Sequence, residues 1–329
     1  MRFFHFFITP LGIRLLRGGI VLLIAGGFLS SGALEQLLSG FDSRHLLGLV
    51  VVQPLILMGL VLQGFRHAML IDRPGLSYLV TTKAVILSQG LNFLLPARLS
   101  EVLKATYLRD RANIPMSIGL SAVVLERTVD LIIVGILGIV SLFFFTTIIR
   151  NTLIFWIIFT IVGILGVAFF GKNKILALLR GIPWQLMGGF LERIYIHFSS
   201  SLRSPKFFLS LGIGLLIWSL SFVNIFLLIE YAGSMQIGLY GALLVFVLTT
   251  LGGAIPALPG GLGTYEAAAV FALMSQGYLF ADALTLAITI HGAQLILPLI
   301  LAFGIMLTER LGLSSLIADL RNNVSSQRD

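Results

Sequence analysis

The apolar regions of this chain are interrupted by the segment PALPGGLGTYE, at residues 256–266. Two prolines and three glycines lie within its first eight residues. Proline removes a backbone donor and clashes with the preceding helical turn, so this segment is not continuous helix. A second break, NFLLPARLSE at residues 92–101, places a proline and charged side chains in another apolar region.

The composition of the 329 residues indicates a polytopic helical membrane protein. Hydrophobic residues make up 57% of the chain and charged residues 11%, with a mean hydropathy of +1.03. Soluble domains carry about 25% charged residues, and disordered chains have low hydrophobicity, so both classes are excluded. The continuous apolar runs also argue against a transmembrane β-barrel. We expect apolar helices at residues 15–34, 46–63, 76–95, 116–145, 152–170, 207–230, 237–255, 264–277 and 283–307, and a short mixed helix at 97–109.

The two breaks predict re-entrant hairpins, at residues 76–109 and 237–277. Irregular backbone at membrane depth is tolerated only where protein buries it or where it lines a watery cavity. If each hairpin returns to its starting side and the N-terminus is cytoplasmic, only Arg44 and Arg150 fall on the outer side, as the positive-inside rule requires. The segment 97–109 would also span only roughly 20 Å as a helix, against about 30 Å of hydrocarbon.

The order of the segments repeats along the chain. A long helix, a hairpin and a second long helix occur within residues 46–145 and again within 207–307, and the two hairpins enter from opposite sides. Inverted repeats with broken helices at the midplane are typical of transporters. We therefore expect an all-α polytopic membrane protein with about six full spans, two oppositely oriented re-entrant hairpins in an inverted repeat, and both termini in the cytoplasm. Residues 1–310 would form one transmembrane domain with a cytoplasmic linker at about 171–206, and residues 311–329 a polar cytoplasmic tail.

Nine titratable side chains lie in the expected membrane segments, where insertion of a charge at mid-helix costs about 2.5–3.5 kcal/mol. They cluster on or beside the two breaks. They are Lys83, Arg98, Glu101, Lys104, Glu126, Arg127, Asp130, Glu266 and His291. The structural alternative is mutual neutralisation that ties helices together, but nine such groups are many for that role. We interpret the set as a functional site.

The helices that restart after Pro96 and after Gly263 would point their N-termini into the membrane, with Ser100 and Thr264 as N-caps. Free backbone N–H groups and the positive end of the helix dipole attract an anion there. With the basic residues nearby, the site suits a phosphate. The alternative is that the glycines only bring helices close together. The tip residues that complete the candidate site are Asn92, Pro259, Gly260, Gly261, Gly263 and Thr264.

Neither a metal, a cofactor nor a nucleic acid is expected as a ligand. The chain contains no cysteine, and no histidine pair has metal-ligand spacing. The net charge of +8 is typical of the cytoplasmic loops of membrane proteins, so it does not by itself indicate nucleic-acid binding.

Three stretches resemble the hallmark motifs of the lysylphosphatidylglycerol synthase transmembrane region family, the flippase-like domain. They are residues 92–101, LERTVD at 125–130 and PGGLGTYEA at 259–267. The first departs from the family's usual Pro-Gly-Arg-x-Gly-Glu form, because Ala97 and Ser100 occupy positions where glycine is common. The resemblance covers roughly residues 12–310 and implies lipid handling. In bifunctional members a soluble synthase domain makes the aminoacylated lipid that this domain translocates, and we expect no lysyl transfer here.

The leading hypothesis is a lipid translocase in the cytoplasmic membrane of a prokaryote. An anionic head group would enter a polar cavity between the hairpins while its tails stay in the bilayer. The residues expected to contact the phosphate are Arg98, Lys104 and Arg127. Those expected to set pairing and gating are Glu101, Glu126 and Glu266.

Two alternatives remain open at this point. One is an integral membrane enzyme that acts on a lipid phosphate, similar to polyprenyl-diphosphate phosphatases. The other is a non-catalytic membrane partner of a lipid-synthesis enzyme. The candidate protein partners are accordingly a second copy of this chain and a lipid-synthesis enzyme.

Overall fold

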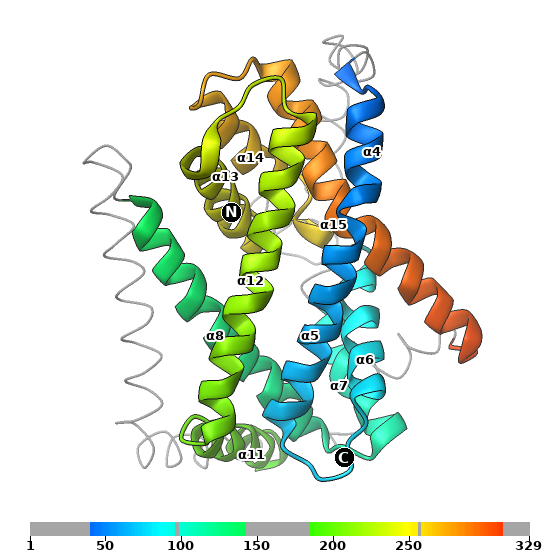
Figure 1. The fold of residues 1–329 in the computed structure, drawn as a ribbon. Helices are drawn as coiled ribbons and strands as arrows, with labels where there is room; N and C mark the ends of the chain where they lie inside the picture. The colour runs from blue at the N-terminus through cyan, green and yellow to red at the C-terminus, as the bar shows by residue number, and fades with distance from the viewer. Residues whose placement is uncertain (1–39, 96–98, 143–184, 256–257, 312–329) are drawn as a thin grey trace, which may run out of the picture.

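The structure is a computed structural model that describes residues 40–95, 99–142, 185–255 and 258–311 (Figure 1). All regular structure in these ranges is helical. The helices are α4 (Ser43–Val51), α5 (Gln53–Ile71), α6 (Tyr78–Leu91), α7 (Leu99–Ala112), α8 (Met116–Leu142), α11 (Gln185–Ser201), α12 (Pro205–Ala232), α13 (Gly238–Ala254), the 3-10 turn η2 (Pro259–Gly261), α14 (Thr264–Met274) and α15 (Phe280–Thr308).

Most helix bounds in the described ranges lie within a few residues of the sequence predictions, but the helix expected at 46–63 is longer, because α4 and α5 together run from Ser43 to Ile71. The expected helices at 15–34 and 152–170 and most of the expected tail lie outside those ranges. The expected linker at 171–206 contains α11, which lies at the lower end of the bundle in Figure 1 and packs against α8.

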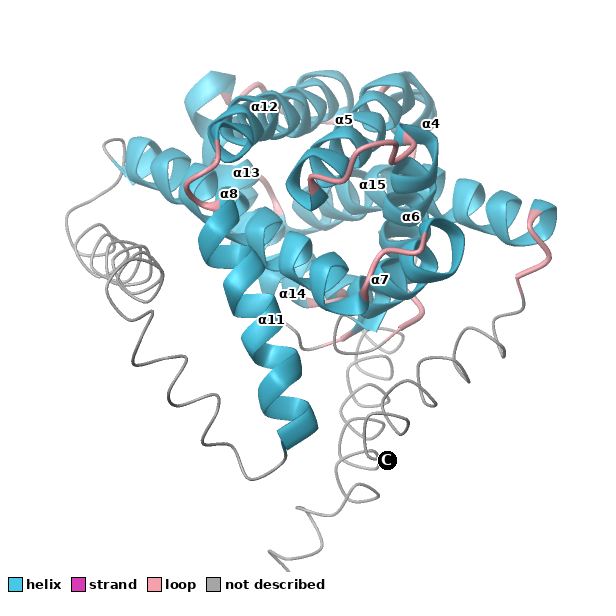
Figure 2. Ribbon diagram, turned by 90° about the horizontal axis from the view of Figure 1, so that it is seen from below, coloured by secondary structure: helices cyan, strands magenta, loops and turns pink. Residues whose placement is uncertain are grey.

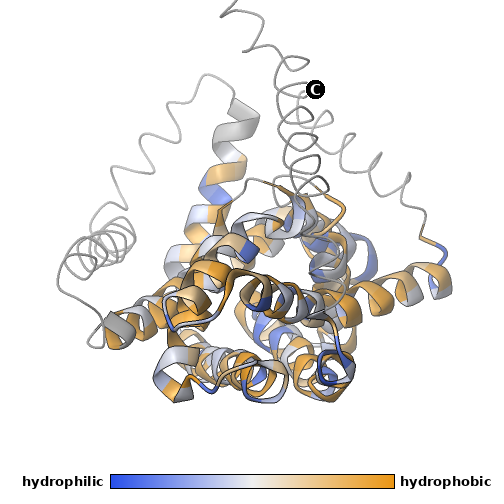
Figure 3. Cartoon of the chain, turned by 90° about the horizontal axis from the view of Figure 1, so that it is seen from above, coloured by the Kyte–Doolittle hydropathy of each residue, from blue (hydrophilic) through white to orange (hydrophobic). Residues whose placement is uncertain are grey.

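Three helices in the described ranges are long and apolar enough to cross a membrane. They are the nearly continuous α4–α5 (Ser43–Ile71), α12 and α15. Large hydrophobic side chains such as Val50, Phe208 and Leu307 are exposed on them. Seen from above, hydrophobic segments occupy much of the periphery of the bundle (Figure 3). Extensive exposed apolar surface of this kind is unsuited to water and suits a lipid environment, so the chain is a membrane protein.

Two pairs of short helices form hairpins between the long helices. The first hairpin (α6 and α7) lies between α5 and α8, and the second (α13 and α14) lies between α12 and α15. In Figure 1 the first hairpin occupies the lower half of the bundle and the second occupies the upper half. The 14 residues of α6 rise about 21 Å, less than the hydrocarbon thickness of about 30 Å. The number of full spans, the re-entrant placement of the hairpins and the side of the termini stay predictions.

Each hairpin is packed in its own apolar core. One core gathers side chains of α5 to α8 with the C-terminal end of α15 around residues such as Leu87 and Leu108. The other gathers α12 to α14 with the N-terminal half of α15 around residues such as Phe246 and Leu273. Seen from below, the helices still form one continuous bundle (Figure 2). Polar side chains are therefore concentrated where the two cores meet.

Glycines set how closely the first hairpin packs. A Cβ added at Gly90 on α6 would lie 2.6 Å from the Cβ of Ala302 on α15 and would also meet the carbonyl of Pro298. A Cβ added at Gly64 on α5 would lie 2.6 Å from the Cα of Thr82 on α6. Because neither glycine carries a side chain, α6 can pack closely against both α5 and α15.

An ionic clamp joins the far ends of α6, α7 and α15. Glu309, at the C-terminal end of α15, is 2.6 Å from the Nζ of Lys83 and 3.2 Å from the guanidinium of Arg111. Tyr107 donates hydrogen bonds of 3.0 Å to the same carboxylate. Burial opposes ionisation of Glu309, but the hydrogen bonds from Lys83 and Tyr107 outweigh it and hold the pKa of the carboxyl below its ordinary value of 4.5.

We predict that Gly90→Ala and Gly64→Ala each destabilise the bundle by about 1–3 kcal/mol, because the added methyl group overpacks a helix interface. The measurement is thermal unfolding in detergent. Gly212→Ala on α12 is the matched control, since nothing lies within 4 Å of its added Cβ, and its midpoint should be unchanged or raised. Equal midpoints for all three variants would contradict the assigned close packing.

We also predict that the clamp around Glu309 loosens in acid. A carboxyl whose pKa is depressed by folding contributes stability that is present above its ordinary value and lost as pH falls through the lower, folded-state value. Below about pH 4.5, wild type should therefore lose a stabilisation that Glu309→Gln lacks at every pH. Thermal midpoints measured from pH 7 downward test this, with Asp110→Asn as an exposed control. Parallel curves for wild type and Glu309→Gln would refute it.

Candidate functional site

The tips of the two hairpins are joined by a hydrogen bond between their backbones. The N–H of Gly260 donates to the carbonyl of Asn92 over 3.1 Å. Gly260 has φ +67°, and a Cβ there would lie 2.8 Å from the ring of Phe93, so both its conformation and the contact favour glycine. The side-chain Oδ1 of Asn92 accepts a hydrogen bond of 3.2 Å from Ser100. Asn92 thus connects both legs of the first hairpin with the tip of the second.

The second tip is held by its own glutamate. The N-cap of α14 is Gly263, and its N–H donates to Glu266 Oε2 over 2.7 Å. Thr264 is the first residue of the helix, and its hydroxyl donates to the carbonyl of Gly261 over 3.1 Å. The expectation that Ser100 and Thr264 act as N-caps is therefore wrong, because both residues lie inside helices.

His291 of α15 connects the second tip to a long helix. Its Nδ1 is 2.7 Å from Glu266 Oε1, and its Nε2 is 3.1 Å from the carbonyl of Gly260. Its ring stacks on Tyr265 with centroids 4.1 Å apart. A carbonyl can only accept, so the contact with Gly260 is a hydrogen bond when Nε2 carries the ring proton. The ring of His291 therefore bridges Glu266 and the backbone of the tip.

Three side chains contact Asp130 of α8, from α5, α12 and α8 itself. The guanidinium of Arg66 on α5, only 2% exposed, lies 2.8 Å from Asp130, and the indole of Trp218 on α12 donates to it over 3.1 Å. Arg127 lies 3.4 Å from Asp130 and 3.4 Å from Glu101 of α7. Ion pairs with good hydrogen-bond geometry are about 2.7–2.9 Å long. Arg66 is therefore tightly bound, whereas Arg127, with 39% of its side chain exposed, is loosely held.

A second charged group is completely enclosed. Lys104 of α7 lies 2.5 Å from Glu126 of α8, and His67 of α5 is 3.0 Å from the other oxygen of the same carboxylate. All three residues are buried. The expected contact of Lys104 with a phosphate would require this pair to open.

The remaining sequence-predicted residues lie in three different places. Lys83 lies in the clamp with Glu309, at the opposite end of α6 from the tip. Arg98 lies outside the described residues. The turn residues Pro259, Gly260 and Gly261 form η2. A Cβ added at Gly261 would lie 3.1 Å from the Cα of Gly253 on α13, so the turn packs closely against that helix.

A polar cavity of about 320 Å³ lies where the tips meet. Residues of α5, α6, α8, α12, α13, α14 and α15 line it, including Arg127, Asp130, Tyr265 and His291. A smaller cavity of about 110 Å³ adjoins it and is lined by Glu101, Lys104 and Arg127 among others. The sequence-selected residues that line one of these cavities are Asn92, Glu101, Lys104, Arg127, Asp130, Gly260 and His291. In the described part of the chain, no group of three potential metal ligands gathers.

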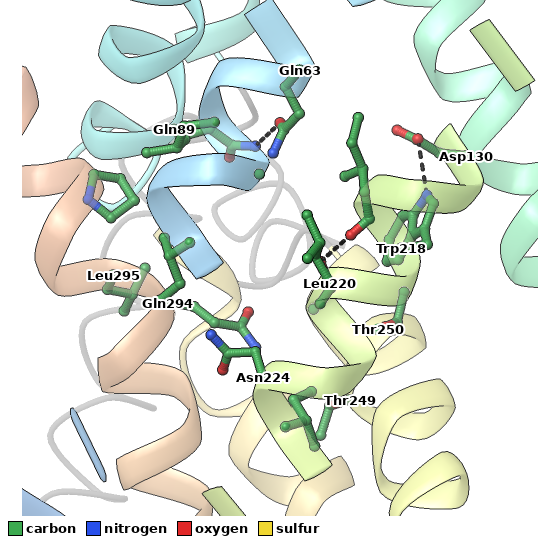
Figure 4. Close-up of a pocket in the computed structure, with 18 of the residues that line it drawn as sticks. Gln63, Gln89, Asp130, Trp218, Leu220, Asn224, Thr249, Thr250, Gln294 and Leu295 are labelled. Carbon is green, nitrogen blue, oxygen red and sulfur yellow. Dashed lines mark hydrogen bonds between the residues drawn. The ribbon is translucent and has the colours of Figure 1, made fainter. Parts of the chain in front are cut away.

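Sequence reasoning missed the neutral polar lining of the cavity. Figure 4 shows the carboxamides of Gln63 and Gln89 on one side and those of Asn224 and Gln294 on another. Gln63 and Gln89 are joined by a hydrogen bond of 2.9 Å, and Gln294 donates to Tyr265 over 2.8 Å. Each is a single carboxamide in an apolar helix. Polar side chains in membrane helices usually face the bundle interior, so the sequence alone could have placed these four residues at the cavity.

We predict that Lys104→Met destabilises the protein by about 3–5 kcal/mol, because it leaves Glu126 charged and buried without its partner. The double variant Lys104→Met/Glu126→Gln should recover much of this loss, since the glutamine is neutral and can still hydrogen-bond to His67. Thermal unfolding in detergent measures both. Lys206→Met, which removes an exposed pair with Asp72, is the control and should cost at most about 1 kcal/mol. A double variant less stable than the single one would contradict the assignment.

Comparison with known families agrees with this architecture. The family model of the lysylphosphatidylglycerol synthase TM region matches residues 12–302, nearly the whole chain. No curated protein and no solved structure matches the chain. The match confirms the resemblance of the three motifs and indicates a membrane function related to lipids. The chain therefore belongs to the lysylphosphatidylglycerol synthase transmembrane region family.

Proposed function

We propose that this protein translocates an anionic, phosphate-bearing lipid across the cytoplasmic membrane of a prokaryote. The head group crosses through the cavity between the two hairpin tips, while the acyl or prenyl tails remain in the bilayer. The observation that carries the proposal is the position of a loosely paired arginine, Arg127, in a polar cavity enclosed by the tips of two hairpins.

Arg127 is the described cation best placed to receive a phosphate. Its two carboxylate contacts are 3.4 Å long, whereas Lys104 and Arg66 have contacts of 2.5 and 2.8 Å. An arginine offers five donors in a planar fork that suits phosphate oxygens. A bound phosphate would replace Glu101 and Asp130 as the partner of Arg127, so head-group binding would release the contact between α7 and α8 that Glu101 provides.

The hairpin arrangement supports movement through the protein rather than along its surface. Each tip lies at the junction of two separate apolar cores, and the tips are tied by one backbone hydrogen bond. Ile56, Leu137 and Trp218 pack against both cores, so a change in the relative position of the hairpins would repack these side chains while the buried residues of each core stay together. Alternating access by rocking of one repeat against the other is the usual mechanism for such repeats.

The geometry favours a translocase over the enzymatic and scaffolding alternatives. A lipid-phosphate hydrolase needs a nucleophile or a free base in the cavity, but both ring nitrogens of His291 are engaged, by Glu266 and by Gly260. The hydroxyl groups of Ser221, Thr249 and Thr250, which line the cavity, donate to backbone carbonyls of their own helices. A scaffold protein has no need of a polar cavity with an available arginine.

We predict that Arg127→Ala reduces lipid translocation by at least about tenfold, because a charge-assisted hydrogen bond to the phosphate contributes roughly 1.5–3 kcal/mol. The measurement uses proteoliposomes with fluorescently labelled phosphatidylglycerol and chemical bleaching of the outer leaflet. Arg44→Ala is the control, since it removes an exposed arginine at the N-terminal end of α4.

The outcome that would contradict the proposal is equal translocation by Arg127→Ala and wild type, or none by wild type. Release of inorganic phosphate from a lipid diphosphate in the same vesicles would instead favour the enzymatic alternative.

A further inference from the structure

The inner part of the cavity is lined by uncharged hydrogen-bonding groups rather than by cations. Five carboxamides line it: Gln63, Gln89, Asn92, Asn224 and Gln294. Hydroxyl groups of α12, α13 and α14 add to this lining, and Trp218 and Tyr265 supply aromatic surface. Carboxamides present both a donor and an acceptor, as hydroxyl groups do.

One of these carboxamides has an unfilled hydrogen bond. Asn224, in the middle of the apolar helix α12, is 3% exposed, and its Oδ1 has no hydrogen-bond partner among the residues that the structure describes. It lines the cavity beside Gln294 in the view of Figure 4. A buried polar atom without a partner is costly, so a ligand group in the cavity that donates to this oxygen gains a favourable hydrogen bond. The structure therefore keeps at this position a group that requires a partner from the cavity.

The nature of the missing partner follows from the chemistry of the acceptor. An amide oxygen takes a hydrogen bond from a donor, so an ionised phosphate or carboxylate, which has only acceptors, cannot satisfy it. A hydroxyl group can, and it also satisfies the NH₂ end of the carboxamide. The deep side of the cavity is thus complementary to a neutral hydroxylated group.

The charges of the cavity limit its ligand in the same way. Asp130 is paired with Arg66 and Arg127, and Glu266 is paired with His291. Among the described residues that line the cavity, no carboxylate is left for an ammonium group. Arg127 offers the loosely held positive charge, enough for one phosphate. The volume of about 320 Å³ corresponds to roughly ten water molecules, which leaves space beyond a single phosphate.

We propose that the lipid head group carried by this protein is a polyhydroxylated one, a sugar or polyol linked to the lipid by one phosphate. The phosphate lies at Arg127, and a hydroxyl group donates to Asn224 Oδ1. This inference rests on the proposed function and names its substrate class.

The test compares two labelled lipids in the same proteoliposome assay, phosphatidylinositol and phosphatidic acid, which share the phosphate and differ in the hydroxylated ring. Wild type should translocate phosphatidylinositol about tenfold faster, the ratio expected for loss of a buried polar contact. Asn224→Leu should bring the ratio of the two rates close to one, because it slows phosphatidylinositol more than phosphatidic acid. Ser219→Leu, an exposed position on the same helix, is the matched control and should behave as wild type.

Thermal unfolding separates a ligand contact from a structural role. Because Asn224 Oδ1 has no partner in the described part of the chain, Asn224→Leu should unfold at the same temperature as wild type or higher. A lower midpoint together with loss of both activities would assign Asn224 to structure and overturn the inference.

The two levels of the proposal fail differently. If wild type translocates both lipids at equal rates, or prefers a lipid with a charged head group such as lysyl-phosphatidylglycerol, the head-group inference is overturned and the translocase proposal stands. If wild type translocates no lipid at all, the translocase proposal fails and the inference fails with it.

Discussion

The site depends on a single backbone hydrogen bond, from the N–H of Gly260 to the carbonyl of Asn92. Both groups lie where a helix has been interrupted, so neither has a partner within its own helix. In a medium without water an unpaired backbone group costs several kcal/mol. The two breaks satisfy each other, and this mutual dependence explains why proline and glycine are tolerated in two separate apolar regions of the chain. It also fixes the tips at the junction of the two apolar cores, where the polar side chains gather.

The charged residues around this junction divide into those that hold the fold and those that remain available. Lys104, Glu126 and His67 are fully enclosed and tie α7, α8 and α5 together. Arg66 does the same for α5 and α8 through Asp130. Arg127 differs, because its contacts are longer and its side chain reaches both cavities. The sequence did not distinguish the roles of Lys104 and Arg127; the lengths of their contacts with carboxylates do.

Much of the fold could be predicted from the sequence, because apolar runs and helix-breaking residues act locally. The bounds of α6, α13 and α14 follow from the positions of proline and glycine within a few residues. The pairing of charges could not be predicted, because it depends on which helices are neighbours: Lys83 lies nine residues before Asn92 along α6 and therefore reaches Glu309 rather than the tip. The carboxamide lining was missed for the same reason, since Gln63 and Asn224 meet only after the bundle has formed.

The central claim is that both tips lie at the middle of the membrane, reached from opposite sides. The chain contains no cysteine, so one introduced cysteine can carry a spin label whose depth in a bilayer is read from its collisions with oxygen and with a water-soluble nickel complex. The exposed residues Leu94 and Ile255 lie at the two tips, and Leu79 and Leu239 lie at the bases of the two hairpins. We predict that labels at both tips report the depth of the bilayer centre and that labels at the two bases report opposite interfaces. Labels at Leu94 or Ile255 that report an interface would contradict the account.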